Sequence, residues 1–146
     1  MSRYEDLIKK IGIKFKDESI LDNAFIHRSY LNEHKQERIE SNERLEFLGD
    51  AVLELISTQY LFNKHPDKTE GELTNLRSAL VQGRHLAEIS KELNLGEYLY
   101  LSKGEEASGG KTKNYILANV MEAVIGAIYL DKGFDEASKF VNEFIL

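Results

Sequence analysis

The stretch from Ser41 to Phe62 contains no proline, so we interpret it as one long helix. At about 100° of rotation per residue, its apolar side chains gather on one side of the helix. The chain as a whole has a single proline, and its apolar residues recur mostly at helical spacing, so the sequence predicts an all-α domain. The predicted core stripe of the long helix comprises Leu45, Leu48, Val52, Leu55 and Ile56.

Another side of this helix is acidic. Glu43, Glu46 and Asp50 fall within an arc of about 60°, and no Lys or Arg lies on that arc to offset their charge. One interpretation is a solvated face, where each like-charged pair costs roughly a few tenths of a kcal/mol. The other is a site for a hard divalent cation, because such cations bind oxygen ligands.

Two further residues favour a functional face. Phe47 points toward the acidic side, where an exposed aromatic ring indicates a surface that a partner covers. Gly49 lies in the middle of the helix at a cost of about 1 kcal/mol relative to alanine. A glycine there indicates that another backbone or a ligand approaches closely.

Composition limits the classes of function. The 146 residues suit one domain, and no apolar run approaches the ~20 residues of a membrane span. The start of the chain is no signal peptide, and the absence of cysteine excludes disulfides and thiolate chemistry, which is compatible with a cytoplasmic protein. The net charge of −6 argues against binding nucleic acid through bulk basicity. A polyanionic partner therefore requires local basic patches, bound cations or a second domain.

Capping residues and glycines predict the remaining elements. Thr69 and Glu72 have the spacing of a capping box, and Gly83 is expected to separate two helices. The apolar pattern that begins at Phe134 is still running at Leu146, so we expect the chain to be cut before a further domain. The predicted helices cover residues 4–11, 17–30, 69–82, 84–93, 115–130 and 134–146, and the clearest predicted loop covers 102–113.

The predicted helix over 115–130 supplies polar groups of its own. Asn119 and Glu122 are three residues apart on one face, flanked by Ala123 and Gly126, whose small side chains permit close helix packing. Such a face is either tight packing with satisfied polar groups or the second half of a site. Placed against the acidic face, it adds one carboxylate and one amide oxygen, which are ligands that Mg²⁺ accepts.

Four motifs together resemble the ribonuclease III endonuclease domain. They are His27-Arg28-Ser29-Tyr30, the stretch from Asn42 to Leu53, the stretch from Glu70 to Arg77, and the stretch from Ile116 to Asp131. The resemblance covers residues 1–146 and implies an all-α homodimer that cuts double-stranded RNA with Mg²⁺, for which Mn²⁺ substitutes. It also implies that a double-stranded-RNA-binding domain follows in the family and is absent from this chain.

The resemblance implies a role for each acidic residue. Glu46, Asp50 and Glu122 match the metal-binding carboxylates, and Glu43 matches a supporting acid of the catalytic group. Asn119 departs from the family, which usually has Asp at this position. An amide oxygen still coordinates Mg²⁺ but brings no charge, so we expect Asn119 to weaken or reorient the metal.

The resemblance and the residues also suggest contacts outside the acidic group. By resemblance, Glu70 lines the catalytic valley and Phe47 inserts into the partner subunit. Arg77, Lys111 and Lys113, with Lys103, are candidate phosphate contacts, because duplex RNA is bound mostly through its backbone. The implied activity is hydrolysis to 5′-phosphate and 3′-hydroxyl ends in RNA processing, such as that of ribosomal precursors. The alternative is a catalytically impaired dimer that binds structured RNA as a scaffold, because of Asn119.

Overall fold

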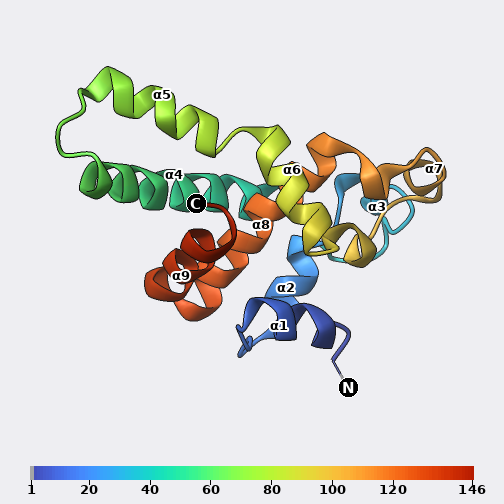
Figure 1. The fold of residues 1–146 in the computed structure, drawn as a ribbon. Helices are drawn as coiled ribbons and strands as arrows, with labels where there is room; N and C mark the ends of the chain where they lie inside the picture. The colour runs from blue at the N-terminus through green and yellow to red at the C-terminus, as the bar shows by residue number, and fades with distance from the viewer. Residues whose placement is uncertain (1) are drawn as a thin grey trace.

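Two long helices, α4 (Glu43–Lys64) and α8 (Asn114–Lys132), form the centre of the fold in the computed structural model, which describes residues 2–146 (Figure 1). Helix α8 is the most deeply buried element, since Ile116 to Ala118 and Ala123 to Ile128 are all buried. Its sequence is apolar on nearly every side, as expected for a helix that other elements surround.

The two central helices meet at glycines. A Cβ on Gly49 would lie 1.7 Å from the carbonyl oxygen of Glu122, and a Cβ on Gly126 would lie 2.4 Å from the carbonyl oxygen of Leu45. Real Cβ atoms do not approach oxygen so closely, so only glycine permits this crossing at either position. The expectation of a close backbone approach at Gly49 is confirmed.

Shorter helices cover the central pair. Helix α6 (Gly83–Glu92) packs on α8, helix α9 (Phe134–Phe144) packs on α8 and α4, and helix α5 (Glu70–Leu80) packs on α4 (Figure 1). The remaining elements are α1 (Glu5–Ile11), α2 (Glu18–Ala24), α3 (Arg28–Leu31), η1 (Leu95–Tyr98), α7 (Lys103–Ala107) and η2 (Gly110–Thr112). No strand occurs in residues 2–146 apart from one isolated bridge, so the all-α prediction is confirmed.

Predicted helix starts agree with the caps in the structure. The Asp17 side chain accepts a hydrogen bond from the backbone N–H of Ser19 and begins α2. Thr69 and Glu72 form the expected capping box of α5. None of the helices within residues 2–146 has the length and apolar content needed to cross a membrane.

The single helix predicted over 17–30 is wrong. Helix α2 ends at Ala24, and a second, short helix begins at Arg28. Between them the backbone pairs with a distant segment: the Tyr100 N–H donates to the Phe25 carbonyl at 2.8 Å, and the His27 N–H donates to the Tyr100 carbonyl at 3.1 Å. In a continuous helix, the Phe25 carbonyl and the His27 N–H would instead form hydrogen bonds within the helix.

Two other predictions need correction. The segment 102–113, expected as a loop, contains α7 and η2, and the Ser102 side chain accepts a hydrogen bond from Glu105 N–H to begin α7. Leu55, expected in the core stripe, is 57% exposed. The buried face of α4 is rotated relative to the predicted one and includes Leu53 and Leu61.

Candidate active site

Carboxylates from both central helices meet beside the glycine crossing. Glu43 and Glu46 lie in the first turn of α4, and Asp50 follows one turn later. The crossing brings the backbone of Glu122, on α8, against Gly49, next to Asp50. The structure therefore brings together side chains that are 72 residues apart in the sequence, counted from Asp50 to Glu122.

These carboxylates shift one another's protonation. The pKa of Glu122 is raised to about 9 by burial, then by a hydrogen bond with Asp50, and by the negative charges of Asp50 and Glu46. The pKa of Glu46 is raised by burial and by the charges of Glu43 and Asp50. Neither shift has a Lys or Arg among its causes, so neither the Glu122 nor the Glu46 carboxyl is held in its charged form by a cationic partner.

Asn119 lies beside this group. A cleft of about 160 Å³ is lined by Glu43 and Glu46 from α4, by Asn119 and Tyr115 from α8, and by residues at the start of α3. Asn119 precedes Glu122 by three residues, so both project from neighbouring positions on α8. The structure thus places the predicted amide ligand next to the predicted carboxylates.

The donor set fits a hard divalent cation. No three His, Cys, Asp or Glu side chains within residues 2–146 converge into a ready metal cluster. Instead, burial and the neighbouring Asp50 raise the pKa of Glu122, so without a cation this carboxyl holds a proton. A divalent cation held by Glu46, Asp50, Glu122 and the Asn119 amide oxygen would replace that proton and supply the missing positive charge.

Glu70 and Arg77 lie away from the acidic group. They line a different pocket, of about 470 Å³, together with Thr58 and Phe62 from the C-terminal half of α4. Arg77 donates a hydrogen bond to the Thr58 hydroxyl at 2.9 Å and lies 3.5 Å from Glu54. Within one protomer, these two predicted substrate contacts therefore do not join the site.

Two of the three predicted lysine contacts, Lys111 and Lys113, are already paired. Lys113 forms an ion pair with Glu105, and Lys111 lies 3.3 Å from a carboxylate oxygen of Glu106. Because each cation has an anionic neighbour on the same segment, neither presents uncompensated positive charge.

Phe47 projects from the acidic end of α4 into solvent. It is 82% exposed and lines a pocket of about 580 Å³ that also includes Leu130, which is 56% exposed. The prediction that this ring faces outward is confirmed.

Asn42 has a positioning role that the sequence motifs did not reveal, and His27 has the capping role expected of a histidine at a helix end. The buried Asn42 side chain donates to the Ala24 carbonyl at 3.0 Å and so ties the N-terminus of α4 to the end of α2. The His27 Nδ1 accepts from the Ser29 N–H at 3.1 Å and begins α3. Both residues stand in motifs of the resemblance, but their hydrogen-bond partners depend on the folded chain.

Solved structures similar to this chain share its helical architecture. The nuclease domain of ribonuclease III from Campylobacter jejuni superposes with a TM-score of 0.91 and 42% identity, covering 98% of this chain and 96% of that one. Dicer from Pichia stipitis superposes with a TM-score of 0.65 and 29% identity, covering 90% of this chain and 55% of that one. The fold is thus that of a ribonuclease III nuclease domain.

Sequence comparison defines the family. Residues 17–146 match the family described as Ribonuclease-III-like, and the chain belongs to this family. It is 48% identical over 145 residues to Ribonuclease 3 of Listeria monocytogenes serotype 4a (strain HCC23), covering 99% of this chain and 63% of that protein. It is 51% identical over 144 residues to Ribonuclease 3 of Geobacillus sp. (strain WCH70), covering 99% of this chain and 58% of that protein. The chain therefore spans about three-fifths of the length of these relatives.

Proposed function

We propose that this chain is the catalytic domain of a metal-dependent endoribonuclease that hydrolyses double-stranded RNA to 5′-phosphate and 3′-hydroxyl ends. The observation that carries the proposal is the close approach of α4 and α8 at Gly49, which brings Glu122 within the electrostatic influence of Asp50 and Glu46. Similarity to proteins named Ribonuclease 3 over nearly the whole chain supports it.

Each residue of the group has a distinct task in this proposal. When bound, Mg²⁺ supplies an activated water and neutralises the charge on the reacting phosphate. Glu46, Asp50 and Glu122 hold the cation with charged oxygens, whereas Asn119 adds a neutral oxygen that orients it. Glu43, in the first turn of α4 and at the edge of the cleft, holds the polar substrate groups around the reacting phosphate.

We propose that the active form is a homodimer. The Campylobacter jejuni structure is described as showing flexibility in a region involved in dimer formation. In this chain, α4 presents the exposed apolar side chains of Phe47, Leu55 and Phe62, which share one helix face at spacings of eight and seven residues. Insertion of Phe47 into a second copy would remove this apolar surface from water.

Asn119 supports a second candidate function. Because ligand charge contributes to cation affinity, an amide at this position lowers the attraction of the site for Mg²⁺. If the lower affinity for Mg²⁺ prevented catalysis, the chain would form a dimer that binds structured RNA without cutting it. The three remaining carboxylates favour catalysis over this alternative.

Cleavage of end-labelled duplex RNA in Mg²⁺, Mn²⁺ or EDTA tests the proposal. We expect cutting that requires the metal and is lost in Glu122→Ala. Absence of cutting by the parent chain, with activity gained in Asn119→Asp, would instead favour the RNA-binding alternative. Absence of cutting by both would contradict the catalytic proposal.

A further inference from the structure

The acidic group alone repels RNA. Glu43, Glu46, Asp50 and Glu122 form a negatively charged group, and the chain as a whole carries a net charge of −6. A metal ion neutralises the reacting phosphate, but the phosphates on either side of it also have to lie close to this surface. Binding therefore requires at least one cationic side chain beside the carboxylates.

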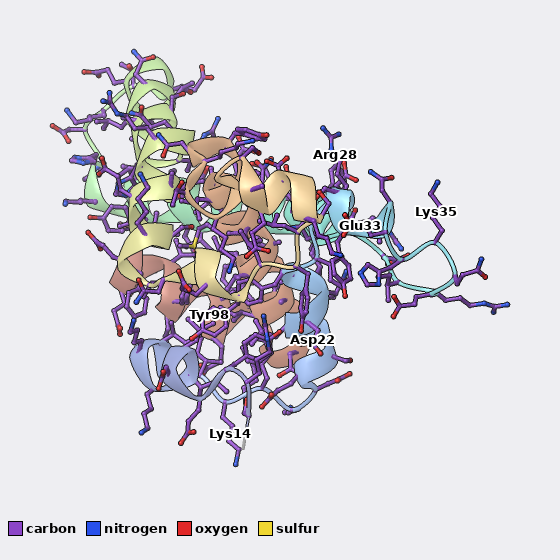
Figure 2. The ribbon with its side chains drawn as sticks, turned by 90° about the vertical axis from the view of Figure 1, so that its right-hand side faces the viewer. Lys14, Asp22, Arg28, Glu33, Lys35 and Tyr98 are labelled. Atoms are coloured by element: carbon purple, nitrogen blue, oxygen red, sulfur yellow. The ribbon has the colours of Figure 1, made fainter. Side chains whose placement is uncertain are left out.

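Arg28 is such a side chain. It is the first residue of α3, it is exposed, and it lines the same cleft as Glu43, Glu46 and Asn119. Within residues 2–146 its guanidinium forms no ion pair or side-chain hydrogen bond, in contrast to Lys111 and Lys113. Figure 2 shows Arg28 at the surface, with its side chain directed away from the ribbon.

The backbone that carries Arg28 is held on both sides. The His27 N–H donates to the Tyr100 carbonyl at 3.1 Å, and the Ser29 hydroxyl accepts from the Ser102 N–H at 3.0 Å. These bonds tie the start of α3 to the segment that leads into α8. Arg28 therefore projects from a fixed position relative to both walls of the cleft, so little conformational freedom of its backbone is lost on binding.

The other wall of the cleft also has the character of a contact surface. Tyr115 lines it and is 57% exposed. An exposed aromatic ring beside polar residues is typical of surfaces that bind a partner. Arg28 from α3 and Tyr115 from α8 thus provide a cationic and an aromatic side chain in a cleft that Glu43 and Glu46 also line.

We propose that Arg28 is a substrate-positioning residue that binds a backbone phosphate of duplex RNA next to the acidic group. A guanidinium matches the geometry of phosphate oxygens in a two-pronged contact, and proteins bind duplex RNA chiefly through phosphate and ribose groups. The inference rests on the proposed function, since it takes duplex RNA as the substrate of this cleft.

The test compares Arg28→Ala and Arg28→Lys with a matched control, Lys14→Ala. Lys14 is also an exposed cation, and Figure 2 shows it at the opposite end of the molecule from Arg28. Two assays are run on each variant. The first gives kcat and KM for duplex RNA in Mg²⁺, and the second gives affinity for the same RNA in EDTA by fluorescence anisotropy over a range of salt concentrations. Thermal unfolding shows that each variant is folded.

In Arg28→Ala we expect roughly tenfold weaker binding and a correspondingly higher KM, with kcat changed far less, and a salt slope reduced by about one. Arg28→Lys should recover part of the affinity, because it keeps the charge and loses the two-pronged geometry. Lys14→Ala should behave as the parent chain. A purely structural role for Arg28 would leave the salt slope unchanged.

The outcomes separate this inference from the proposed function. If the parent chain cleaves RNA and Arg28→Ala matches Lys14→Ala in every measurement, the inference is overturned and the function stands. If the parent chain binds RNA through Arg28 but does not cut it, the catalytic proposal fails and the inference stands. If the parent chain neither binds nor cuts duplex RNA, both are overturned.

Discussion

At the scale of single residues, Glu122 connects stability to function. Its pKa is raised from 4.5 to about 9, mainly because it is buried and then because Asp50 and Glu46 lie near. A metal-free protein therefore keeps a proton on Glu122 at neutral pH, whereas the unfolded chain releases it. Since the folded state binds this proton more tightly, the contribution of Glu122 to stability is fully present below pH ~4.5 and is lost as the pH rises toward 9.

Replacing Glu122 with Gln should raise the melting temperature in EDTA at pH 8. The amide mimics the protonated carboxyl and cannot ionise in the unfolded chain, so folding at pH 8 no longer has to protonate this side chain. The same variant should lose the stabilisation that millimolar Mg²⁺ gives the parent chain, because it lacks one charged ligand. Differential scanning calorimetry at pH 6 and pH 8, with and without Mg²⁺, measures both effects.

The control for this prediction is Glu106→Gln, an acidic residue on α7. It should leave the response to Mg²⁺ unchanged. An unaltered or lower melting temperature for Glu122→Gln in EDTA at pH 8 would show that the raised pKa of Glu122 does not destabilise the metal-free protein.

At the scale of elements, the glycine crossing determines the site. A Cβ on Gly49 would overlap the Glu122 carbonyl, so α4 and α8 would have to move apart. We expect Gly49→Ala to lower the free energy of unfolding by about 3 kcal/mol and to abolish RNA cleavage. Gly71→Ala is the matched control, since no atom lies within 4 Å of its added Cβ and it sits in the first turn of α5.

Urea unfolding measures the two glycine variants side by side. Gly71→Ala should be as stable as the parent chain or about 0.5 kcal/mol more stable, because alanine favours helix over glycine. Equal stability of Gly49→Ala and the parent chain would contradict the account of the crossing.

Much of the helical pattern could be predicted from the sequence, and the reasons are local. The capping box at Thr69 marks the start of α5 and Gly133 the end of α8 through short-range geometry, whereas Gly83, expected to separate two helices, is the first residue of α6. The break after Ala24 could not be predicted, because it depends on backbone pairing with Tyr100. A hydrogen bond between distant segments leaves no periodic signal in either of them.

In the candidate site, too, local patterns could be predicted from the sequence and contacts between distant segments could not. The acidic arc of α4 and the small residues of α8 were visible as patterns, and Gly49 indicated the close approach that joins them. The pairing of Lys111 and Lys113 with nearby glutamates was missed, since α7 and η2 were interpreted as loop. The exposure of Leu55 was missed because hydrophobicity alone does not distinguish a core face from a surface for a partner.

At the scale of the whole molecule, the account requires a second copy of the chain. Phe47→Ala should shift the protein from dimer toward monomer in analytical ultracentrifugation, because an exposed aromatic anchor contributes strongly to an interface. Tyr60→Ala, which removes a half-buried ring from another face of α4, serves as the control. An unchanged dimer in Phe47→Ala would contradict the proposed insertion.

The central claim is that the junction of α4 and α8 holds the divalent cation used for RNA hydrolysis. A crystal soaked in Mn²⁺ and measured for anomalous scattering tests it directly. We expect an anomalous peak among Glu46, Asp50, Asn119 and Glu122 in crystals of the parent chain. In crystals of Glu122→Gln we expect this peak to be absent. A peak elsewhere, or none at this junction under saturating Mn²⁺, would contradict the claim.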